Sequence, residues 1–157
     1  MPPDLRFEIA DLDQAEHAAG LVACLDAYAR DPMGGSSPLP ASVREAIVPG
    51  LKSHGANLSL LAIEGDRIVG VAVCMLSFST FRAAPRLNLH DFTVLPAARG
   101  RGIGRRLLAA VIEHAQASGH CAVTLEVRND NAAAQALYRS LGFADCESPM
   151  AFWVRPV

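Results

Sequence analysis

The stretch from Leu87 to Arg106, LNLHDFTVLPAARGRGIGRR, constrains the fold of this chain most strongly. Its first part contains adjacent β-branched residues and alternates in a way that predicts a strand. In that strand one face would carry Leu87, Leu89, Asp91 and Thr93. Pro96 ends the strand because proline has no N–H group to give to the hydrogen-bond ladder. A turn rich in arginine and glycine follows, and a helical pattern begins directly after it.

A glycine-rich turn at the start of a helix is suited to binding a phosphate group. The first N–H groups of a helix have no partner within the helix, and the helix dipole adds partial positive charge at the same end. Glycines let a large anion approach the backbone closely. We therefore interpret this turn as an anion-binding loop.

Two common phosphate-binding motifs do not fit the turn. A P-loop ends in Gly-Lys-Ser or Gly-Lys-Thr, whereas this chain has Gly104-Arg105-Arg106. The dinucleotide fingerprint G-x-G-x-x-G needs a small third residue, but that position is Arg105 or Leu107. Glu126 does follow at a spacing suited to a ribose contact, yet the turn lies in mid-chain. A nucleotide-dependent oxidoreductase is therefore only a distant alternative.

A third motif, Arg-x-x-Gly-x-Gly, is present as Arg99, Gly102 and Gly104 after a strand ending in Phe-Thr-Val. It resembles the pyrophosphate loop of the GNAT superfamily of N-acetyltransferases, which bind acetyl-coenzyme A (acetyl-CoA). The alternative is an ordinary glycine-rich turn with solvated arginines. The second half of the chain argues against that alternative.

The segment from Thr124 to Phe143, TLEVRNDNAAAQALYRSLGF, resembles the other hallmark of the same superfamily. That hallmark is a strand with Glu-Val, then Asn, then a helix with Ala-x-x-x-Leu-Tyr and a Leu-Gly-Phe exit. Over this segment the resemblance is especially close to the ribosomal-protein alanine N-acetyltransferases. The two signatures also have the expected order and separation, so the chain is identified as a member of the GNAT superfamily.

The first half of the chain does not select a subfamily. The segments FSTF (residues 78–81) and LHDF (residues 89–92) are similar to parts of the diamine acetyltransferases. In that family an acidic pair precedes the equivalent phenylalanine, whereas here the first member of the pair is His90. This departure argues against polyamine specificity.

Length and composition limit the class of protein. A chain of 157 residues is enough for one domain with a core, so we predict a single N-acetyltransferase domain over residues 1–157. The formal net charge of −2 argues against a nucleic-acid partner. No apolar run reaches the length of a membrane span, and the N-terminus lacks the pattern of a signal peptide. We therefore expect a cytoplasmic protein without a membrane partner.

The four cysteines give no indication of a metal site. Cys24, Cys74, Cys121 and Cys146 are scattered, without a CxxC motif or a histidine at ligand spacing. Metal-binding cysteines usually occur in such closely spaced patterns. We interpret all four as small buried side chains in a reducing cytosol and expect neither a metal nor a disulfide framework.

The hydrophobic pattern predicts a mixed α/β (α+β) fold. Near-continuous apolar runs in two central strands favour a sheet covered on both faces. The resemblance implies the GNAT-like mixed, mostly antiparallel central sheet, flanked by helices and parallel where helices cross over. The expected strands are residues 5–9, 58–63, 68–77, 87–94 and 121–127, with a closing hairpin of 143–146 and 150–154. The expected helices are residues 18–28, 42–51, 103–115 and 131–141, the last capped by Asn131.

Acetyl transfer from a thioester to an amine has three physical requirements. The amine must lose a proton to become a nucleophile. The negative charge that develops on the carbonyl oxygen needs a hydrogen-bond donor. The leaving thiolate needs a proton or a nearby N–H group.

The resemblance implies which residues bind acetyl-CoA. In the superfamily the sheet opens beside the strand that precedes the turn, and the pantetheine arm fills the gap as if it were a strand. Here the backbone of Phe92, Thr93 and Val94 would pair with that arm, and Asn131 would contact coenzyme A. Arg99 would complete the turn, and the pyrophosphate would be held by the amides of Gly100, Arg101, Gly102, Ile103, Gly104 and Arg105.

The resemblance assigns Tyr138 as the general acid that protonates the thiolate. A phenol with its ordinary pKa of about 10 can serve as that donor. The alternative is structural, because Tyr138 belongs to an apolar stripe with Ala134, Leu137 and Leu141, where a tyrosine usually packs in the core. Together with the glycine-rich turn, the pattern favours the catalytic role.

Three residues are candidates for the base that accepts the proton of the amine. Glu126 matches the proposed proton acceptor of the alanine acetyltransferases, whereas His90 and Asp91 lie on the strand where other branches place a carboxylate. The structural alternatives are a Glu126 that faces solvent or pairs with Arg128, and a partly buried His90 with a local partner. The proton can also leave through water.

The sequence therefore predicts an acetyl-CoA-dependent N-acetyltransferase whose acceptor is a primary amine of a small molecule or a peptide. Asp26, Asp31, Asp91 and Glu126 would suit a cationic amine if they converged on one groove. The loop of residues 30–40 and the helices beside it are where the acceptor could be recognised. The alternative is a non-catalytic acyl-CoA-binding or regulatory module of the same fold. The closing strands offer edges that can pair in a homodimer.

Overall fold

The computed structural model describes residues 4–157, which form two compact units divided between Glu126 and Val127. Among residues 4–126, five strands form one sheet in the order β1-β2-β3-β4-β5. Their neighbours are antiparallel except for the parallel pair β4–β5. The strands are β1 (Leu5–Ile9), β2 (Asn57–Glu64), β3 (Arg67–Ser79), β4 (Ala84–Val94) and β5 (Val123–Leu125). The predicted mixed, mostly antiparallel sheet is confirmed.

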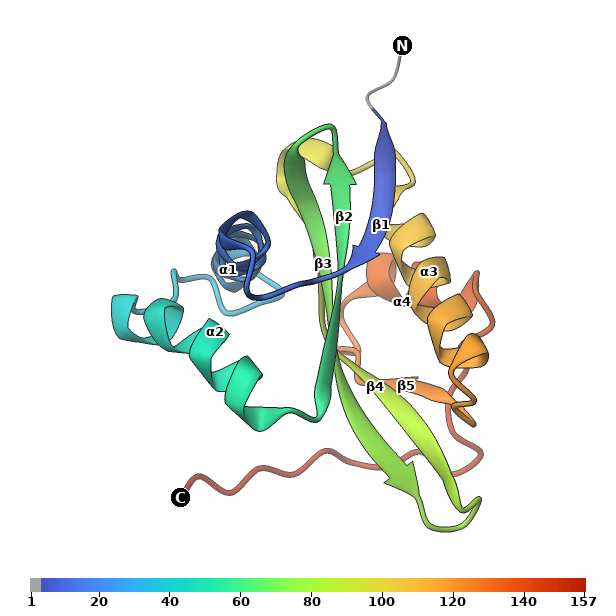
Figure 1. Ribbon diagram of the computed structural model, residues 1–157. Coiled ribbons are helices and arrows are strands. Elements are labelled where there is room, and N and C mark those ends of the chain that lie inside the picture. Colours follow the sequence, from blue (N-terminus) through green and yellow to red (C-terminus); the bar gives the residue numbers. More distant parts are fainter. Residues whose placement is uncertain (1–3) are drawn as a thin grey trace. The chain divides into compact units, whose positions relative to one another are not determined.

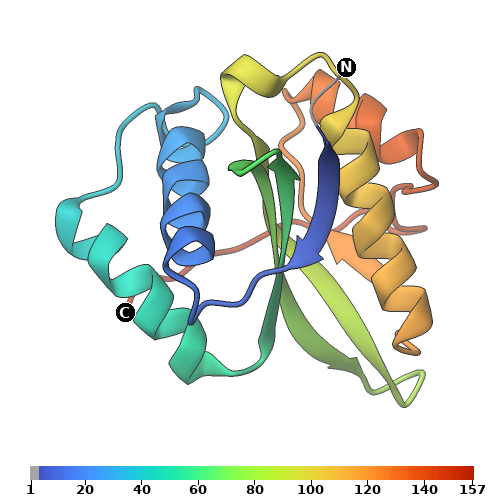
Figure 2. The same ribbon diagram turned by 45° about the horizontal axis from the view of Figure 1, so that its top comes forward.

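Helices cover both faces of this sheet. Helices α1 (Ala15–Arg30) and α2 (Ala41–His54) lie on one face, and α3 (Ile103–Ala117) lies on the other (Figures 1 and 2). A short 3-10 turn, η1 (Pro96–Ala98), connects β4 to the segment that precedes α3. The arrangement explains the near-continuous apolar runs of β2 and β3, because strands buried on both faces have no solvent side to alternate with.

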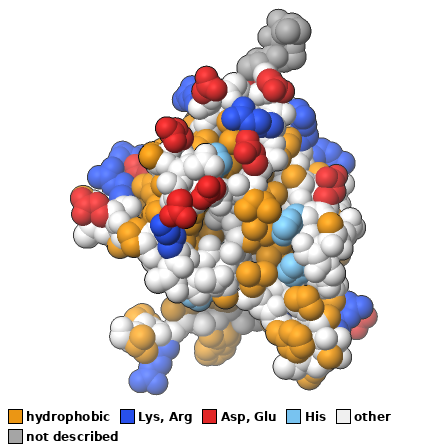
Figure 3. All heavy atoms as spheres, viewed as in Figure 1, with side chains coloured by type: hydrophobic (Ala, Val, Ile, Leu, Met, Phe, Trp, Pro, Cys, Tyr) orange, Lys and Arg blue, Asp and Glu red, His pale blue; other side chains and the backbone are white. Residues whose placement is uncertain are grey.

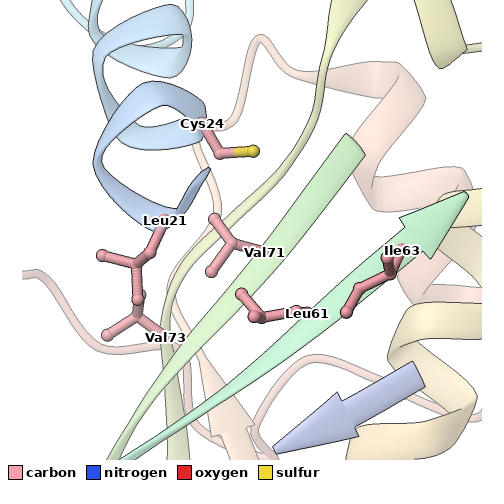
Figure 4. Close-up of a cluster of buried hydrophobic side chains, with 6 residues drawn as sticks. All are labelled: Leu21, Cys24, Leu61, Ile63, Val71 and Val73. Atoms are coloured by element: carbon pink, nitrogen blue, oxygen red, sulfur yellow. The ribbon is translucent and has the colours of Figure 1, made fainter. Parts of the chain in front are cut away.

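The helices on the first face are amphipathic. Their outer surfaces carry acidic and basic side chains that lie intermingled (Figure 3). Their inner surface contributes to a core in which Leu21 and Cys24 of α1 meet side chains of the two central strands (Figure 4). The strand residues of this cluster are Leu61, Ile63, Val71 and Val73. On the other face α3 buries Ile103, Leu107, Leu108, Val111 and Ala115, which confirms its predicted apolar side.

Truncation of a side chain in this core is expected to lower the free energy of unfolding by about 2–5 kcal/mol. Leu61 is fully buried, so Leu61→Ala leaves a cavity that its rigid neighbours fill only in part. The matched control is Leu76→Ala on β3, whose side chain is 41% exposed and should lose little stability. Chemical denaturation of both variants measures the difference, and equal losses would contradict the assignment of this core.

Strand β4 contains a bulge that the sequence pattern does not show. Val73 of β3 pairs with Asp91, and its neighbour Cys74 pairs with Leu89, so His90 is the extra residue. Paired residues in a sheet point to the same face. Asp91 therefore shares the α1 face with Val73, while Leu89 lies on the opposite face with Cys74. The prediction that Leu87, Leu89, Asp91 and Thr93 share one face of the strand is therefore wrong, because one inserted residue reverses the alternation.

In the unit Val127–Val157, helix α4 (Ala132–Arg139) begins as predicted. The side-chain oxygen of Asn131 accepts a hydrogen bond from the N–H group of Ala134 at 3.1 Å. This interaction satisfies one of the N–H groups that a helix start leaves without an internal partner. The predicted cap is therefore confirmed.

The predicted closing hairpin is wrong. Residues 143–157 contain neither strand nor helix, and the large apolar side chains of Met150, Phe152 and Trp153 are exposed. A strand register is fixed by burying one of its two faces, and this segment has no buried face to fix it. The strand edges on which the predicted homodimer depended are thus not formed, and the homodimer stays a prediction.

Candidate active site

The glycine-rich turn adopts the conformation that its sequence requires. Gly100 and Gly102 have φ angles of +73° and +75°, in the left-handed region that other residues rarely adopt. Gly102 is the N-cap residue of α3, and no side chain caps that helix. A Cβ atom built on either glycine would meet no other atom within 4 Å. The N-terminus of α3 therefore opens onto space that can accept an anion.

Arg99 holds the turn against two other elements. Its Nε donates to the carbonyl oxygen of Val94 at 2.8 Å, and its Nη1 lies 2.8 Å from a carboxylate oxygen of Asp31. Asp31 is the C-cap residue of α1. The pKa of the Asp31 carboxyl lies below its ordinary value because the N–H group of Met33 and the Arg99 guanidinium both bind the carboxylate. The arginine thus fixes the end of β4 to the end of α1.

Arg101 is fixed to strand β2 in a similar way. Both of its terminal nitrogens contact the carboxylate of Glu64, one at 3.2 Å. The pKa of Glu64 is lowered by this guanidinium. The local sequence contains no signal for either ion pair, because the partners are far apart in the chain.

Strand β4 extends past its neighbour β5. The two strands pair only where Leu87–Leu89 face Val123–Leu125, whereas β4 continues to Val94. On its other edge β4 remains paired with β3 as far as Val94. Phe92, Thr93 and Val94 therefore lie beyond the end of the parallel pair.

A pocket of about 450 Å³ lies on the α1 face of the sheet, between α1, α2, the loop that joins them, β3 and β4. Its lining includes His90 and Asp91, together with Tyr28 and many aliphatic residues. Both His90 and Asp91 reach the pocket, although neighbours in a regular strand point to opposite faces, because the bulge lies at this point. The structure thus brings two of the three candidate bases together.

Asp91 has an environment suited to proton transfer. Burial raises the pKa of its carboxyl above the ordinary value of 3.8, and the neighbouring His90 opposes part of this increase. The Asp91 side chain is half-buried, and a carboxylate with a raised pKa is a better base near neutral pH than one with the ordinary value. It is also a common property of functional sites.

Asp91→Asn is expected to raise the free energy of unfolding at neutral pH. The raised native pKa means that the folded state binds a proton more tightly than the unfolded state does. The stabilising contribution of Asp91 is therefore complete below its ordinary pKa of 3.8 and is lost as pH rises through the native pKa. In denaturation experiments, the difference in free energy of unfolding between Asp91→Asn and the wild type should therefore grow as pH rises from the ordinary pKa through the native pKa. The control is Asp66→Asn in the exposed β2–β3 turn, where the substitution should change the free energy of unfolding little.

Glu126 occupies a different place in the same unit. It follows β5, is exposed, and accepts hydrogen bonds from Nδ2 of Asn88 at 3.3 and 3.5 Å. It is not part of the lining of the pocket. Nor are Asp26 and Asp31, which bind Arg30 and Arg99 respectively. The four carboxylates therefore do not converge on this pocket, and Asp91 is the one that lines it.

Tyr138 and Asn131 belong to the unit Val127–Val157. The ring of Tyr138 is half-buried, and its centroid lies 6.0 Å from that of Phe143 with the planes tilted by 60°. This geometry is favourable for two aromatic rings. The oxygen of Asn131 is the N-cap described above, so any contact of this side chain with a ligand would come in addition to the cap.

The cysteines agree with the prediction only in part. Cys24 and Cys74 are buried, and burial raises the pKa of their thiols to about 11 and about 12. Cys121 is half-buried, and Cys146 is exposed, so the prediction that all four are buried is wrong.

Across residues 4–157 no three His, Cys, Asp or Glu side chains are grouped so that they could hold a metal ion. No helix within these residues is both long and apolar enough to cross a membrane.

The family model that matches this chain is that of the Acetyltransferase (GNAT) family, and the match covers residues 21–143. The chain belongs to the GNAT family. The match includes β4, the glycine-rich turn, α3, β5 and α4. It confirms the superfamily that the two sequence signatures indicated.

Relatives and solved structures agree with this family. The chain is 44% identical over 81 residues to N-alpha-acetyltransferase RimI of Mycobacterium tuberculosis. The aligned region covers 50% of this chain and 49% of that protein. It is 31% identical over 145 residues to mycothiol acetyltransferase of Renibacterium salmoninarum, covering 89% of this chain and 40% of that protein. The chain thus spans about half or less of the length of these two curated relatives. A crystal structure of a probable acetyltransferase has the same fold, with a TM-score of 0.80, 23% identity and coverage of 97% of both chains.

Proposed function

We propose that this chain transfers the acetyl group of acetyl-CoA to a primary amine. Membership of the GNAT family and the acetyltransferase names of its relatives support the proposal. The observation that carries it is the turn at the start of α3, where two left-handed glycines open the helix N-terminus beside the end of β4. We also propose that residues 1–157 act as one N-acetyltransferase domain.

The residues of the turn fit the diphosphate of coenzyme A. The space beside Gly100 and Gly102 is open, and the dipole of α3 favours negative charge there. The amides of residues 100–105 would hold the diphosphate, while the side chains of Arg99 and Arg101 keep the turn in place through Asp31 and Glu64. The backbone of residues 92–94 would pair with the pantetheine arm, and Asn131 would contact coenzyme A.

Acetyl-CoA, when bound, supplies an acetyl group activated as a thioester. The amine nitrogen forms a bond to the carbonyl carbon and loses a proton, the carbon–sulfur bond breaks, and the sulfur gains a proton. The products are an N-acetylated amine and the thiol of coenzyme A. We assign Tyr138 as the donor of the proton to sulfur.

We favour Asp91 as the acceptor of the proton from the amine, directly or through a water molecule. It lines the pocket, and burial raises its pKa toward the range in which a base is effective. His90 lies beside it and is the second candidate. Glu126 is the third candidate, held by Asn88 at the end of β5.

Ligand-dependent melting and thiol release test the function together. Acetyl-CoA is expected to raise the melting temperature, whereas NAD and ATP at the same concentration are not, because a ligand stabilises the state that binds it. A panel of primary amines should then release the thiol of coenzyme A. The absence of a shift with acetyl-CoA would contradict the cofactor assignment. A shift without turnover on any amine would instead favour the non-catalytic acyl-CoA-binding module.

A further inference from the structure

The pocket on the α1 face has a lining that is unsuited to a highly polar acceptor. The side chains of Leu25 from α1, Val43 and Ile47 from α2, and Met75 from β3 form much of its surface. Helices α1 and α2 lie side by side over this face of the sheet (Figure 2). Its volume of about 450 Å³ falls within the range of pockets that bind small molecules.

The lining contains a carboxylate beside an imidazole. His90 and Asp91 lie next to each other at the bulge of β4. Among the described residues that line the pocket, Asp91 is the acidic one. The carboxylate of Asp26, which is outside the lining, is turned to Arg30 at 2.9 Å and to the N–H group of Leu39 at 2.8 Å. One carboxylate, beside His90, thus lines a pocket whose other side chains are mostly apolar.

The wall formed by the loop between α1 and α2 is built into the fold. The N–H group of Gly34 donates to the carbonyl oxygen of Asp31, and that of Leu39 donates to Asp26. A Cβ atom at Gly34 would lie 1.9 Å from the carbonyl oxygen of Tyr28, so the loop packs directly on α1. These backbone donors are already used inside the protein and are not offered to a ligand.

We propose that the acceptor is a primary amine carried by a compact apolar body, such as an arylalkylamine. The apolar body lies between α1 and α2, and the amino group lies at Asp91. This inference rests on the proposed acetyl transfer, and it selects one acceptor class from those that the sequence left open. An ammonium ion forms its strongest hydrogen bonds with a carboxylate, and the apolar lining favours the rest of the molecule.

The same pocket disfavours two other acceptor classes. A polyamine would place a second ammonium beside aliphatic side chains such as Val43 and Ile47, and the described residues of the lining offer no second carboxylate to pair with it. A peptide N-terminus would bring backbone N–H and C=O groups that also need hydrogen-bond partners. The bound donors of Gly34 and Leu39 do not supply them.

The experiment compares three probes at saturating acetyl-CoA: 2-phenylethylamine, spermidine and a tripeptide with a free N-terminal alanine. Initial rates of thiol release give kcat/KM for each. We expect 2-phenylethylamine to exceed the other two by at least about tenfold, the scale that burial of a few methylene-sized groups supplies. A higher kcat/KM for spermidine or the tripeptide would overturn the inference while leaving acetyl transfer intact.

A matched pair of variants tests the location. Ala46 lines the pocket from α2, whereas Ala41 lies in the same helix outside the lining, and both are exposed. Ala46→Leu should raise KM for 2-phenylethylamine severalfold and leave the melting shift with acetyl-CoA unchanged. Ala41→Leu should change neither quantity. Equal effects of the two variants on KM would overturn the location.

A binding measurement separates this inference from the reaction itself. Calorimetric titration of 2-phenylethylamine into the protein with coenzyme A, which carries no acetyl group, reports acceptor binding without turnover. Asp91→Asn is expected to weaken binding about tenfold to a hundredfold, the loss of one charged hydrogen bond. No binding by the wild-type protein at millimolar amine, in a sample that still melts higher with acetyl-CoA, would overturn the acceptor class alone. No response to acetyl-CoA would overturn the proposed function.

Discussion

Gly102→Val is expected to weaken acetyl-CoA binding about a hundredfold or more. The φ angle of +75° is costly for any residue with a Cβ, and most of all for a β-branched one. The new side chain would also project into the open space at the start of α3, where the proposed diphosphate lies. Loss of two hydrogen bonds to a charged group accounts for the size of the effect. Calorimetric titration with acetyl-CoA measures it.

The control for this variant lies at the other end of the same helix. Gly119 follows α3, has a φ angle of +73° and likewise has no atom within 4 Å of a built Cβ. Gly119→Val should therefore cause a similar loss of stability while leaving acetyl-CoA binding unchanged. If both variants bind acetyl-CoA equally well after correction for the folded fraction, the turn does not hold the diphosphate.

Tyr138→Phe is expected to lower kcat about 10² to 10⁴-fold, the range found for general acids and bases. The substitution removes the hydroxyl group that we assign as proton donor and keeps the ring that contacts Phe143. The KM for acetyl-CoA should change little, because the proposed diphosphate and pantetheine contacts come from other residues. Steady-state rates at saturating acetyl-CoA and amine measure the loss.

The complementary variant, Phe143→Leu, separates the hydroxyl from the packing. It alters the ring contact of Tyr138 and retains the phenol. We expect a lower melting temperature with a much smaller loss of kcat than in Tyr138→Phe. Turnover of Tyr138→Phe equal to that of the wild type would remove the catalytic role, and the tyrosine would then be a packing residue of α4.

Asp91 connects stability with function in this protein. Its burial disfavours the charged form in the folded state, as the raised pKa indicates, so Asn at this position should stabilise the fold. The same burial makes the carboxylate a stronger base and a stronger partner for an ammonium ion. The expected outcome for Asp91→Asn is therefore a more stable protein that binds its acceptor less well, a common trade-off at functional sites.

The local sequence was sufficient for the elements whose chemistry is local. The turn was predicted from its run of glycines after Pro96, and the structure gives Gly100 and Gly102 the left-handed backbone that glycine adopts at little cost. The cap at Asn131 was predicted because its oxygen reaches the N–H group of a residue three positions later. The closing hairpin failed for the opposite reason, because alternation fixes a strand only where a face becomes buried.

The sequence by itself determined the glycine turn at the start of α3, which depends on neighbouring residues. Through the resemblance of two motifs it also indicated the GNAT family and the mostly antiparallel sheet. Only the tertiary structure decided which carboxylate lines the pocket. Regular alternation placed Asp91 with Leu87 and Leu89, but the pairing of Val73 with Asp91 and of Cys74 with Leu89 moves it to the α1 face. The ion pair of Arg99 with Asp31 was decided in the same way. Both depend on contacts between elements that are distant in the sequence, and no local sequence pattern indicates which residues meet there.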